Sequence, residues 1–248
     1  MERVFQTPVF LFKMCTEYLS PISFAMLMRA SPDAWRCRKR NFPWLTMEEF
    51  TMRRVEREIG IPKVVSDIRD GKIMLTGGFL LAVLNGKDTS VCQDIDFLGI
   101  CPYAEDSVIV REPYGSLTGL IENVSDRVMN GKKLQFIQFL ASVIDPISTY
   151  DFEFCRNRLG GGKLRVLNVS SILEETCFYD INLEYYKSYF EHMHANDLAN
   201  VAGRIYLRLC KYVRRGYEVC IRQTNTKSTV WNSFWSDRIK GGRVIEYR

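Results

Sequence analysis

The sequence predicts an α+β fold, in which a small mixed or antiparallel sheet is flanked by N-terminal and C-terminal helical segments. Short apolar or alternating runs typical of strands gather in residues 66–170, among them "KIMLT", "DIDFLGI" and "KLQFIQFL". The stretches on either side, 1–65 and 171–248, carry helix start signals or helical spacing of apolar residues. We therefore expect an N-terminal helical segment, a central core and a C-terminal helical, basic segment.

The N-terminal helices are predicted from their ends. Pro21 and Pro32, which follow serines, are typical of the first turn of a helix. Thr46 and Glu49 form a capping box, and Gly60 is a suitable C-terminal stop for the helix between them.

Composition places the chain among ordinary globular proteins, because 46% of its 248 residues are hydrophobic and 25% are charged. No apolar run has the length of a membrane span, and no secretory signal is recognisable, so we expect an intracellular, cytoplasmic protein without a membrane partner. The eight cysteines form no CxxC pair, which favours buried free thiols in a reducing compartment. The only histidines, His192 and His194, are two residues apart in a predicted helix and do not make a metal site.

A glycine pair follows the first predicted strand. "KIML" is followed by Gly77 and Gly78, and "FLLAVLNG" then predicts a helix that ends at Gly86. Glycines let the backbone approach a ligand closely, and the free N–H groups of a helix N-terminus attract phosphate. The pair is a candidate phosphate site, with an ordinary turn as the alternative.

Two aspartates begin the next predicted strand. Asp94 and Asp96 are spaced i, i+2, so they point to the same face of a strand. Neighbouring carboxylates repel each other unless a cation lies between them, and hard ions such as Mg²⁺ prefer oxygen ligands. We expect a metal site here, with a solvent-facing polar strand end as the alternative.

A further carboxylate is expected from "STYDFEFCRNRL", which is predicted to be a strand that continues through a hairpin turn at Gly160–Gly162. Asp151 and Glu153 would share one face of that strand. If it pairs beside the "DIDF" strand, Asp151 completes a three-carboxylate cluster. Such a cluster can hold two Mg²⁺ or Mn²⁺ ions about 3.5–4 Å apart for phosphoryl transfer.

Taken together, "LTGGF", "DIDF" and "YDFEF" resemble the pattern of the nucleotidyltransferase superfamily of DNA polymerase β type. The resemblance extends over about residues 70–217 toward uncharacterised nucleotidyltransferase-like proteins of large DNA viruses and some eukaryotes. It implies transfer of a nucleoside monophosphate from an NTP to a hydroxyl acceptor, with release of pyrophosphate. If the protein is viral, host cytoplasm or the virion is its expected place.

The resemblance also implies roles for individual residues. Gly77 and Gly78 would hold the triphosphate, Asp94 and Asp96 would bind both metal ions, and Asp151 would bind the catalytic ion and help to deprotonate the acceptor. Glu153 is the alternative third carboxylate. The sequence departs from many active members at Gly78, where those proteins have serine.

The C-terminal segment is basic, with eleven Lys/Arg and three Asp/Glu from residue 203 onward. A helix is predicted from a cap at Asn196 or Asp197 to a stop at Gly216. Three of its cations, Arg204, Arg208 and Lys211, are candidate contacts for the nucleotide phosphates, and a solvated basic face is the alternative. RNA is a candidate acceptor, because basic residues interleaved with aromatics can bind single strands.

The N-terminal "LSPISFAMLMRASPDAW" faintly resembles an F-box. This resemblance implies a protein partner, a ubiquitin-ligase adaptor, bound through the N-terminal helices. The second functional hypothesis follows from it: a non-catalytic interaction or virion structural protein that keeps the nucleotidyltransferase fold.

Overall fold

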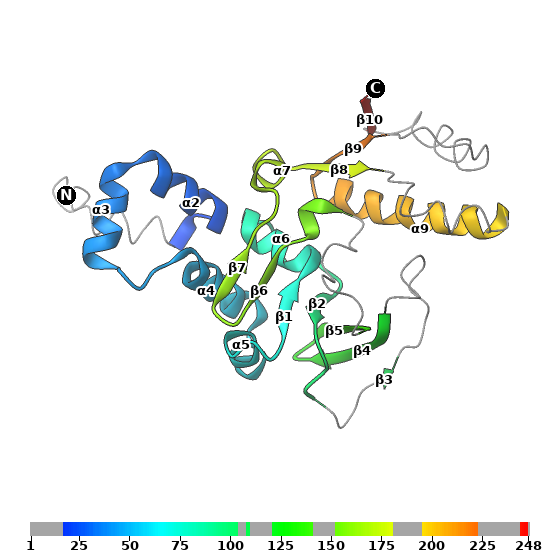
Figure 1. The fold of residues 1–248 in the computed structure, drawn as a ribbon, viewed down its shortest axis with the longest axis horizontal. Coiled ribbons are helices and arrows are strands. Elements are labelled where there is room, and N and C mark those ends of the chain that lie inside the picture. The colour runs from blue at the N-terminus through cyan, green and yellow to red at the C-terminus, as the bar shows by residue number, and fades with distance from the viewer. Residues whose placement is uncertain are drawn as a thin grey trace. The chain divides into compact units, whose positions relative to one another are not determined.

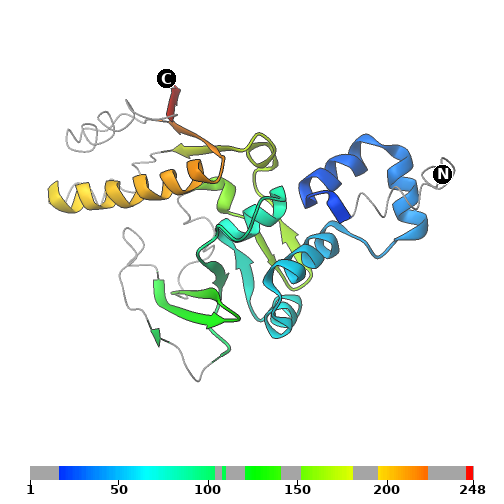
Figure 2. The same ribbon diagram turned by 180° about the vertical axis from the view of Figure 1, so that it is seen from behind.

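The computed structural model describes residues 17–103, 108–109, 121–140, 152–180, 195–222 and 244–247. The chain divides into two compact units, shown as ribbons in Figures 1 and 2. The first comprises residues 1–111, 123–139 and 155–169, and the second comprises 112–122, 140–154 and 170–248.

The first unit begins with helices whose starts were predicted from the sequence. Ser20, Ser31 and Thr46 each accept a hydrogen bond from the backbone N–H three residues later, which confirms the three start signals. Gly60 ends its helix in the left-handed conformation, as predicted. Among its described residues, the helices of this unit are α2 (Pro21–Ala30), α3 (Pro32–Asn41), α4 (Met47–Ile59), α5 (Pro62–Arg69) and α6 (Gly77–Asn85).

The main sheet has seven strands within the described residues, in the order β3-β4-β5-β2-β1-β6-β7. Strands β2 and β5 run parallel, whereas β1 pairs antiparallel with both β2 and β6, so the sheet is mixed and the fold is α+β. The strands are β1 (Met74–Thr76), β2 (Ile95–Leu98), β3 (Val108–Ile109), β4 (Ile121–Met129), β5 (Lys132–Phe139), β6 (Arg158–Gly160) and β7 (Lys163–Arg165). Strand β4 was not predicted, whereas the hairpin of β6 and β7 was.

One row of side chains across the four central strands is entirely apolar. The strand register aligns Leu159, Leu75, Phe97 and Phe136, and none of them is more than 1% exposed. Phe97 and Phe136 stack with ring centroids 5.1 Å apart. Helix α6 contacts β1, β2 and β6, and lies beside them in Figures 1 and 2. Burial of this row fixes the register of the strands, because a slip by one residue would turn each apolar side chain to the other face.

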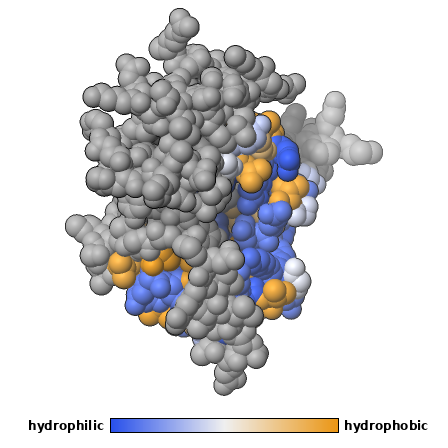
Figure 3. Space-filling model, turned by 90° about the vertical axis from the view of Figure 1, so that its right-hand side faces the viewer, coloured by the Kyte–Doolittle hydropathy of each residue, from blue (hydrophilic) through white to orange (hydrophobic). Residues whose placement is uncertain are grey.

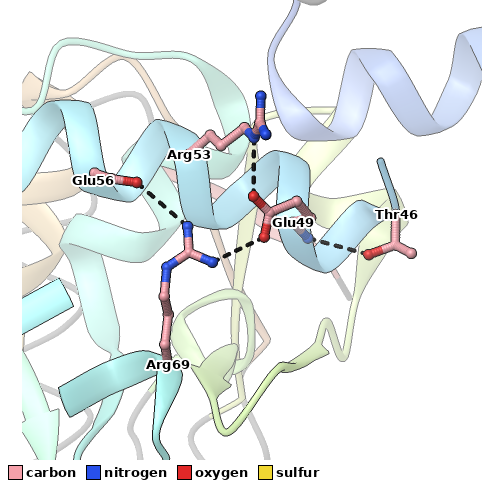
Figure 4. Close-up of polar contacts among 5 residues, drawn as sticks. All are labelled: Thr46, Glu49, Arg53, Glu56 and Arg69. Atoms are coloured by element: carbon pink, nitrogen blue, oxygen red, sulfur yellow. Dashed lines mark hydrogen bonds and ion pairs between the residues drawn. The ribbon is translucent and has the colours of Figure 1, made fainter. Parts of the chain in front are cut away.

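Helices α4 and α5 are joined by ion pairs that centre on one carboxylate (Figure 4). Glu49 binds Arg53 at 2.9 Å and Arg69 at 3.0 Å, and Arg69 also binds Glu56 at 3.3 Å. Burial alone would raise the pKa of Glu49, but the hydrogen bonds from Arg69 and Arg53 lower it below its ordinary value. Only half of the predicted capping box forms, since the Glu49 side chain bonds to these arginines while its backbone N–H donates to Thr46.

The second unit corrects the prediction that residues 171–248 are helical. It contains a three-stranded parallel sheet in the order β10-β9-β8 besides its helices. Its elements are α7 (Val169–Leu173, whose first residue belongs to the first unit), β8 (Thr176–Asp180), α9 (Ala195–Arg214), β9 (Glu218–Arg222) and β10 (Val244–Tyr247). These strands are short, and parallel partners distant in sequence leave no local signal.

Helix α9 starts slightly before its predicted cap, so that Asn196 and Asp197 lie inside its first turn. It ends near the predicted stop, where Gly216 has φ +82° and the Tyr217 N–H donates to the Tyr212 carbonyl.

The strand predicted over "STYDFEFC" is wrong in its described part, because Glu153–Cys155 forms a 3₁₀ helix. Phe152 and Phe154 are both buried and both pack edge-on against Tyr212, with centroid distances of 5.3 and 4.7 Å. Their spacing of two residues suggested a strand with one apolar face. It instead reflects two rings that pack on the same tyrosine of α9.

Among the described residues, no helix is both long and apolar enough to cross a membrane. On the face in Figure 3, hydrophilic residues form most of the described surface, and hydrophobic residues lie in small separate groups. On α2, Ile22 and Phe24 are buried within the unit at 4% and 1% exposure, whereas Met26 is 42% exposed.

Candidate functional site

The glycine turn lies between β1 and α6, as the sequence predicted. Gly77 has φ +70°, a conformation that favours glycine, and it is the first residue of α6. A Cβ added at Gly77 would overlap the carboxylate Oδ2 of Asp96. The absence of a side chain at this position therefore makes the room in which the Asp96 carboxylate lies.

The two aspartates begin the strand that pairs with β1. Asp96 lies in β2 directly opposite Thr76, and Asp94 precedes the first residue of β2 by one position. Both aspartates are partly buried, while Ile95 and Phe97 are buried on the other face of the strand. The predicted strand is confirmed, and its alternation turns Asp96 to the face opposite Ile95 and Phe97, beside the glycine turn.

A polar row crosses the sheet through Asp96. The strand register aligns Arg158 on β6 with Thr76 on β1, Asp96 on β2 and Gln135 on β5. Aligned residues of paired strands point to the same face, so this row lies on the opposite face from the apolar row. The buried Thr76 hydroxyl donates to the Asn157 carbonyl at 2.7 Å, which holds β6 against β1 where Arg158 begins.

A lysine stands on the other side of the aspartates. Lys133 on β5 stands two residues before Gln135, the partner of Asp96, so Lys133 shares the face of Asp96. Asp126 on β4 fixes this edge, because it accepts from Gln135 at 3.0 Å and pairs with Lys133 at 2.6 Å. Lys133 on β5 and Arg158 on β6 thus lie on the same face of the sheet as Asp96, with β2 and β1 between them.

No pattern in the sequence predicted that Lys133, Arg158 or Asp126 would lie near this site. Each stands on a strand remote in sequence from the aspartates, and only the register of those strands brings it to this face. The alternation of "KLQFIQF" was a signal that Lys133 and Gln135 share a face, but it does not say which strand lies next to it.

A cavity of about 320 Å³ opens beside the start of β2. Its size is at the lower end of the range for small-molecule sites, roughly 300–1,000 Å³. Phe79 and Ile95 supply apolar wall, and Cys92, which also lines the cavity, places its Sγ 3.8 Å from the Gly78 carbonyl oxygen. The remaining lining residues are mostly polar: Glu58, Asp88, Thr89, Ser90, Gln93, Gly131, Lys132 and Lys133. The cavity therefore adjoins the glycine turn and has groups that can both donate and accept hydrogen bonds.

The third carboxylate is not placed by the structure. Asp151 lies outside the described residues, and the side chain of Glu153 is likewise not described. The expected pairing of their segment beside the "DIDF" strand is wrong, because the two neighbours of β2 are β5 and β1. Along the chain, Asp151 precedes Arg158, at the start of β6, by seven residues.

The predicted phosphate-binding cations lie on α9 of the second unit. Arg208 and Lys211 are partly buried there, and Arg204 is described only by its backbone. Their part in a nucleotide site stays a prediction.

The described donor set suits a hard divalent cation. The Asp96 carboxylate lies in a space that the missing Cβ of Gly77 leaves open, Asp94 stands two residues before it, and carboxylate oxygens are the ligands that Mg²⁺ and Mn²⁺ prefer. No group of three or more His, Cys, Asp or Glu that could hold a metal ion occurs within the part of the chain that the structure describes.

Comparison with protein-family models, with curated proteins and with solved structures found no match to this chain.

Proposed function

We propose that the protein is a metal-dependent nucleotidyltransferase, which moves a nucleoside monophosphate from an NTP to a hydroxyl acceptor and releases pyrophosphate. One observation carries the proposal: Asp94 and Asp96 stand two residues apart at the start of β2, and the Asp96 carboxylate lies against the Gly77 turn that begins α6. A carboxylate pair and a helix N-terminus side by side offer both a cation site and an anion site.

The triphosphate would lie against the N-terminus of α6. The free N–H groups of the first turn point out of the helix at Gly77 and Gly78, where no Cβ obstructs a phosphate. Lys133 and Arg158 carry the positive charge on this face, so they would contact the phosphate oxygens on either side of the aspartates. The cavity beside Phe79 and Gln93 would receive the nucleoside.

Asp94 and Asp96 would hold divalent cations, which supply charge neutralisation for the triphosphate when bound. The acceptor oxygen attacks the α-phosphorus, a new P–O bond forms, and the bond between the α-phosphorus and the bridging oxygen of the β-phosphate breaks. That oxygen leaves with its electron pair as part of pyrophosphate, and the proton of the acceptor hydroxyl passes to a carboxylate base. Asp151, which the resemblance implies as the third carboxylate, is the proposed base.

The first test removes both described carboxylates. We expect the double variant Asp94→Ala, Asp96→Ala to lose transfer and magnesium-dependent NTP binding, while its far-UV circular dichroism stays that of wild type. Calorimetric titration of each NTP with Mg²⁺ or Mn²⁺ measures the binding, and pyrophosphate release measures the reaction. The double variant Glu122→Ala, Glu174→Ala removes the same charge from exposed positions and should bind like wild type.

Equal NTP binding by the aspartate variant and by wild type would overturn the assignment. Binding without pyrophosphate release, across RNA, protein and small-molecule acceptors, would favour the non-catalytic interaction protein instead.

A further inference from the structure

Most side chains of helix α3 are exposed to solvent. Only Cys37 among its ten residues is buried, and it packs in a small core with Phe24, Leu45 and Phe50. A short helix with one buried side chain gains little from packing. Its exposed face is therefore free to serve a partner.

The side chains opposite Cys37 follow from helical geometry. At 100° per residue, Trp35 and Lys39 point away from the core, and Arg36 and Arg40 form a neighbouring row along one flank. Trp35 is 42% exposed, although tryptophan has one of the largest apolar side chains. Arg36 forms an ion pair with Asp33 in which both side chains are exposed. Arg36 can therefore exchange Asp33 for another anion at little cost in free energy.

A second exposed indole lies in the loop after α3. Trp44 is 50% exposed, and the guanidinium of Arg53 lies 4.3 Å from its ring centroid. Trp35 is arranged alike, with Arg38 and Lys39 at 5.1 and 5.3 Å from its ring centroid. Each indole thus combines an exposed ring with cations held against it.

The positive charge is concentrated at α3. From Arg29 to Arg40 the chain has five Lys/Arg and one Asp, which gives a net charge of +4 where the whole chain has +5. Residues 29–40 and the C-terminal segment are therefore basic, whereas the rest of the chain is balanced or acidic.

We propose that the α3 surface, defined as Trp35, Arg36, Lys39 and Arg40, binds single-stranded nucleic acid. Exposed rings stack on bases and cations pair with the phosphates between them, which is how single strands are held without sequence preference. Arginine predominates, and its planar fork matches phosphate oxygens better than an ammonium does. The surface is independent of the aspartate pair, so it binds its partner whether or not the protein transfers nucleotides.

Two other partners fit the surface less well. A helix that lies in an anionic membrane needs a broad apolar face, whereas Trp35 is the single large apolar side chain on the outward face of α3. An acidic peptide would use the cations but gives no reason for an exposed indole with cations against its ring.

The experiment measures fluorescence anisotropy of an end-labelled 15-nucleotide oligouridylate with the full chain, at 50 and 200 mM KCl. Trp35→Ala should weaken binding about 5- to 150-fold and leave the salt dependence unchanged, because it removes stacking alone. Trp35→Phe should retain most of the affinity. The double variant Arg36→Gln, Arg40→Gln should reduce the slope of log K against log salt by about 1.4, since each phosphate contact on a single strand contributes about 0.7.

The matched control is Arg57→Gln with Lys163→Gln, which removes two exposed cations elsewhere in the same unit and should change neither affinity nor slope beyond error. Circular dichroism and melting temperature verify that each variant folds. The proposal is wrong if Trp35→Ala binds like wild type, or if the control weakens binding as much as the arginine variant. Tighter binding to phosphatidylserine vesicles or to polyglutamate than to the oligonucleotide would assign the surface to a membrane or to an acidic protein.

Discussion

At the scale of single residues, the position that constrains the site most is Gly77. It meets two requirements at once, because its φ of +70° disfavours other residues and its missing Cβ leaves room for the Asp96 carboxylate. Many glycines in turns meet only the first requirement. Gly162 is one of them, with φ +69° and no atom within 4 Å of an added Cβ.

Substitutions at Gly77 and Gly162 can distinguish the effect of backbone strain from the effect of displacing the Asp96 carboxylate. We expect Gly162→Ala to destabilise the protein by about 1–2 kcal/mol, the cost of a left-handed residue with a Cβ, and to leave NTP binding unchanged. Gly77→Ala should be destabilised by at least as much and should also lose magnesium-dependent NTP binding, because its Cβ displaces the Asp96 carboxylate. Urea unfolding and calorimetric titration measure the two effects. Normal nucleotide affinity in Gly77→Ala would show that the position of this carboxylate does not matter for binding.

At the scale of elements, the contact of α4 with α5 depends on charge as well as on packing. Glu49 on α4 joins the two helices through Arg69 on α5 and also binds Arg53 within α4 (Figure 4), and these hydrogen bonds lower its pKa despite its partial burial. A carboxyl whose folded pKa is lowered stabilises the fold above its unfolded value of about 4.3. That contribution is lost as the pH falls through the folded pKa.

We therefore expect Glu49→Gln to lower the melting temperature at pH 6–7 and to have little effect once the pH is well below about 4.3. Thermal unfolding of both proteins between pH 3 and 7 measures the difference. Arg69→Gln tests the same interaction by changing the partner of Glu49, because it removes the largest contribution that lowers the pKa of Glu49. A difference between wild type and Glu49→Gln that stays constant down to pH 3 would contradict this account.

At the scale of the whole molecule, ligand binding and stability are linked. If Mg²⁺ and NTP bind the folded protein alone, a nucleotide concentration of about 100 Kd adds about 2.7 kcal/mol to the free energy of unfolding. For a chain of this size we expect a rise in Tm of about 5–11 °C. Differential scanning fluorimetry with and without magnesium measures it. The aspartate double variant should show no rise, and an equal rise without magnesium would place the nucleotide elsewhere.

The elements that could be predicted from the sequence are those with local signals. Ser31 before Pro32, Thr46 before α4 and Gly77 after β1 mark ends of helices through bonds within a few residues, and the structure confirms them. The alternation in β2 likewise predicts that Asp94 and Asp96 share a face. These features depend on neighbours along the chain, so one segment is sufficient to predict them.

The features that could not be predicted depend on partners far along the chain. The rings of Phe152 and Phe154 pack on Tyr212, which turns an apparent strand into a 3₁₀ helix. Lys133 and Arg158 reach the face of Asp96 through the register of β5 and β6. In each example the deciding contacts join segments that are distant in the sequence, so they form only when the unit that contains them folds.

The alternation of an apolar row and a polar row links the position of Asp96 to the packing of the sheet. If β2 shifted by a single position against its neighbours, Phe97 would enter the polar row beside Thr76 and Gln135, and Asp96 would enter the apolar row. Removing Phe97 from the apolar core and burying a carboxylate among apolar side chains both cost free energy. The hydrophobic effect that stabilises the core therefore also fixes the position of the aspartates. A substitution that damages the apolar row at Leu75 or Phe136 should therefore displace Asp96, and weaken the proposed NTP binding, before it unfolds the chain.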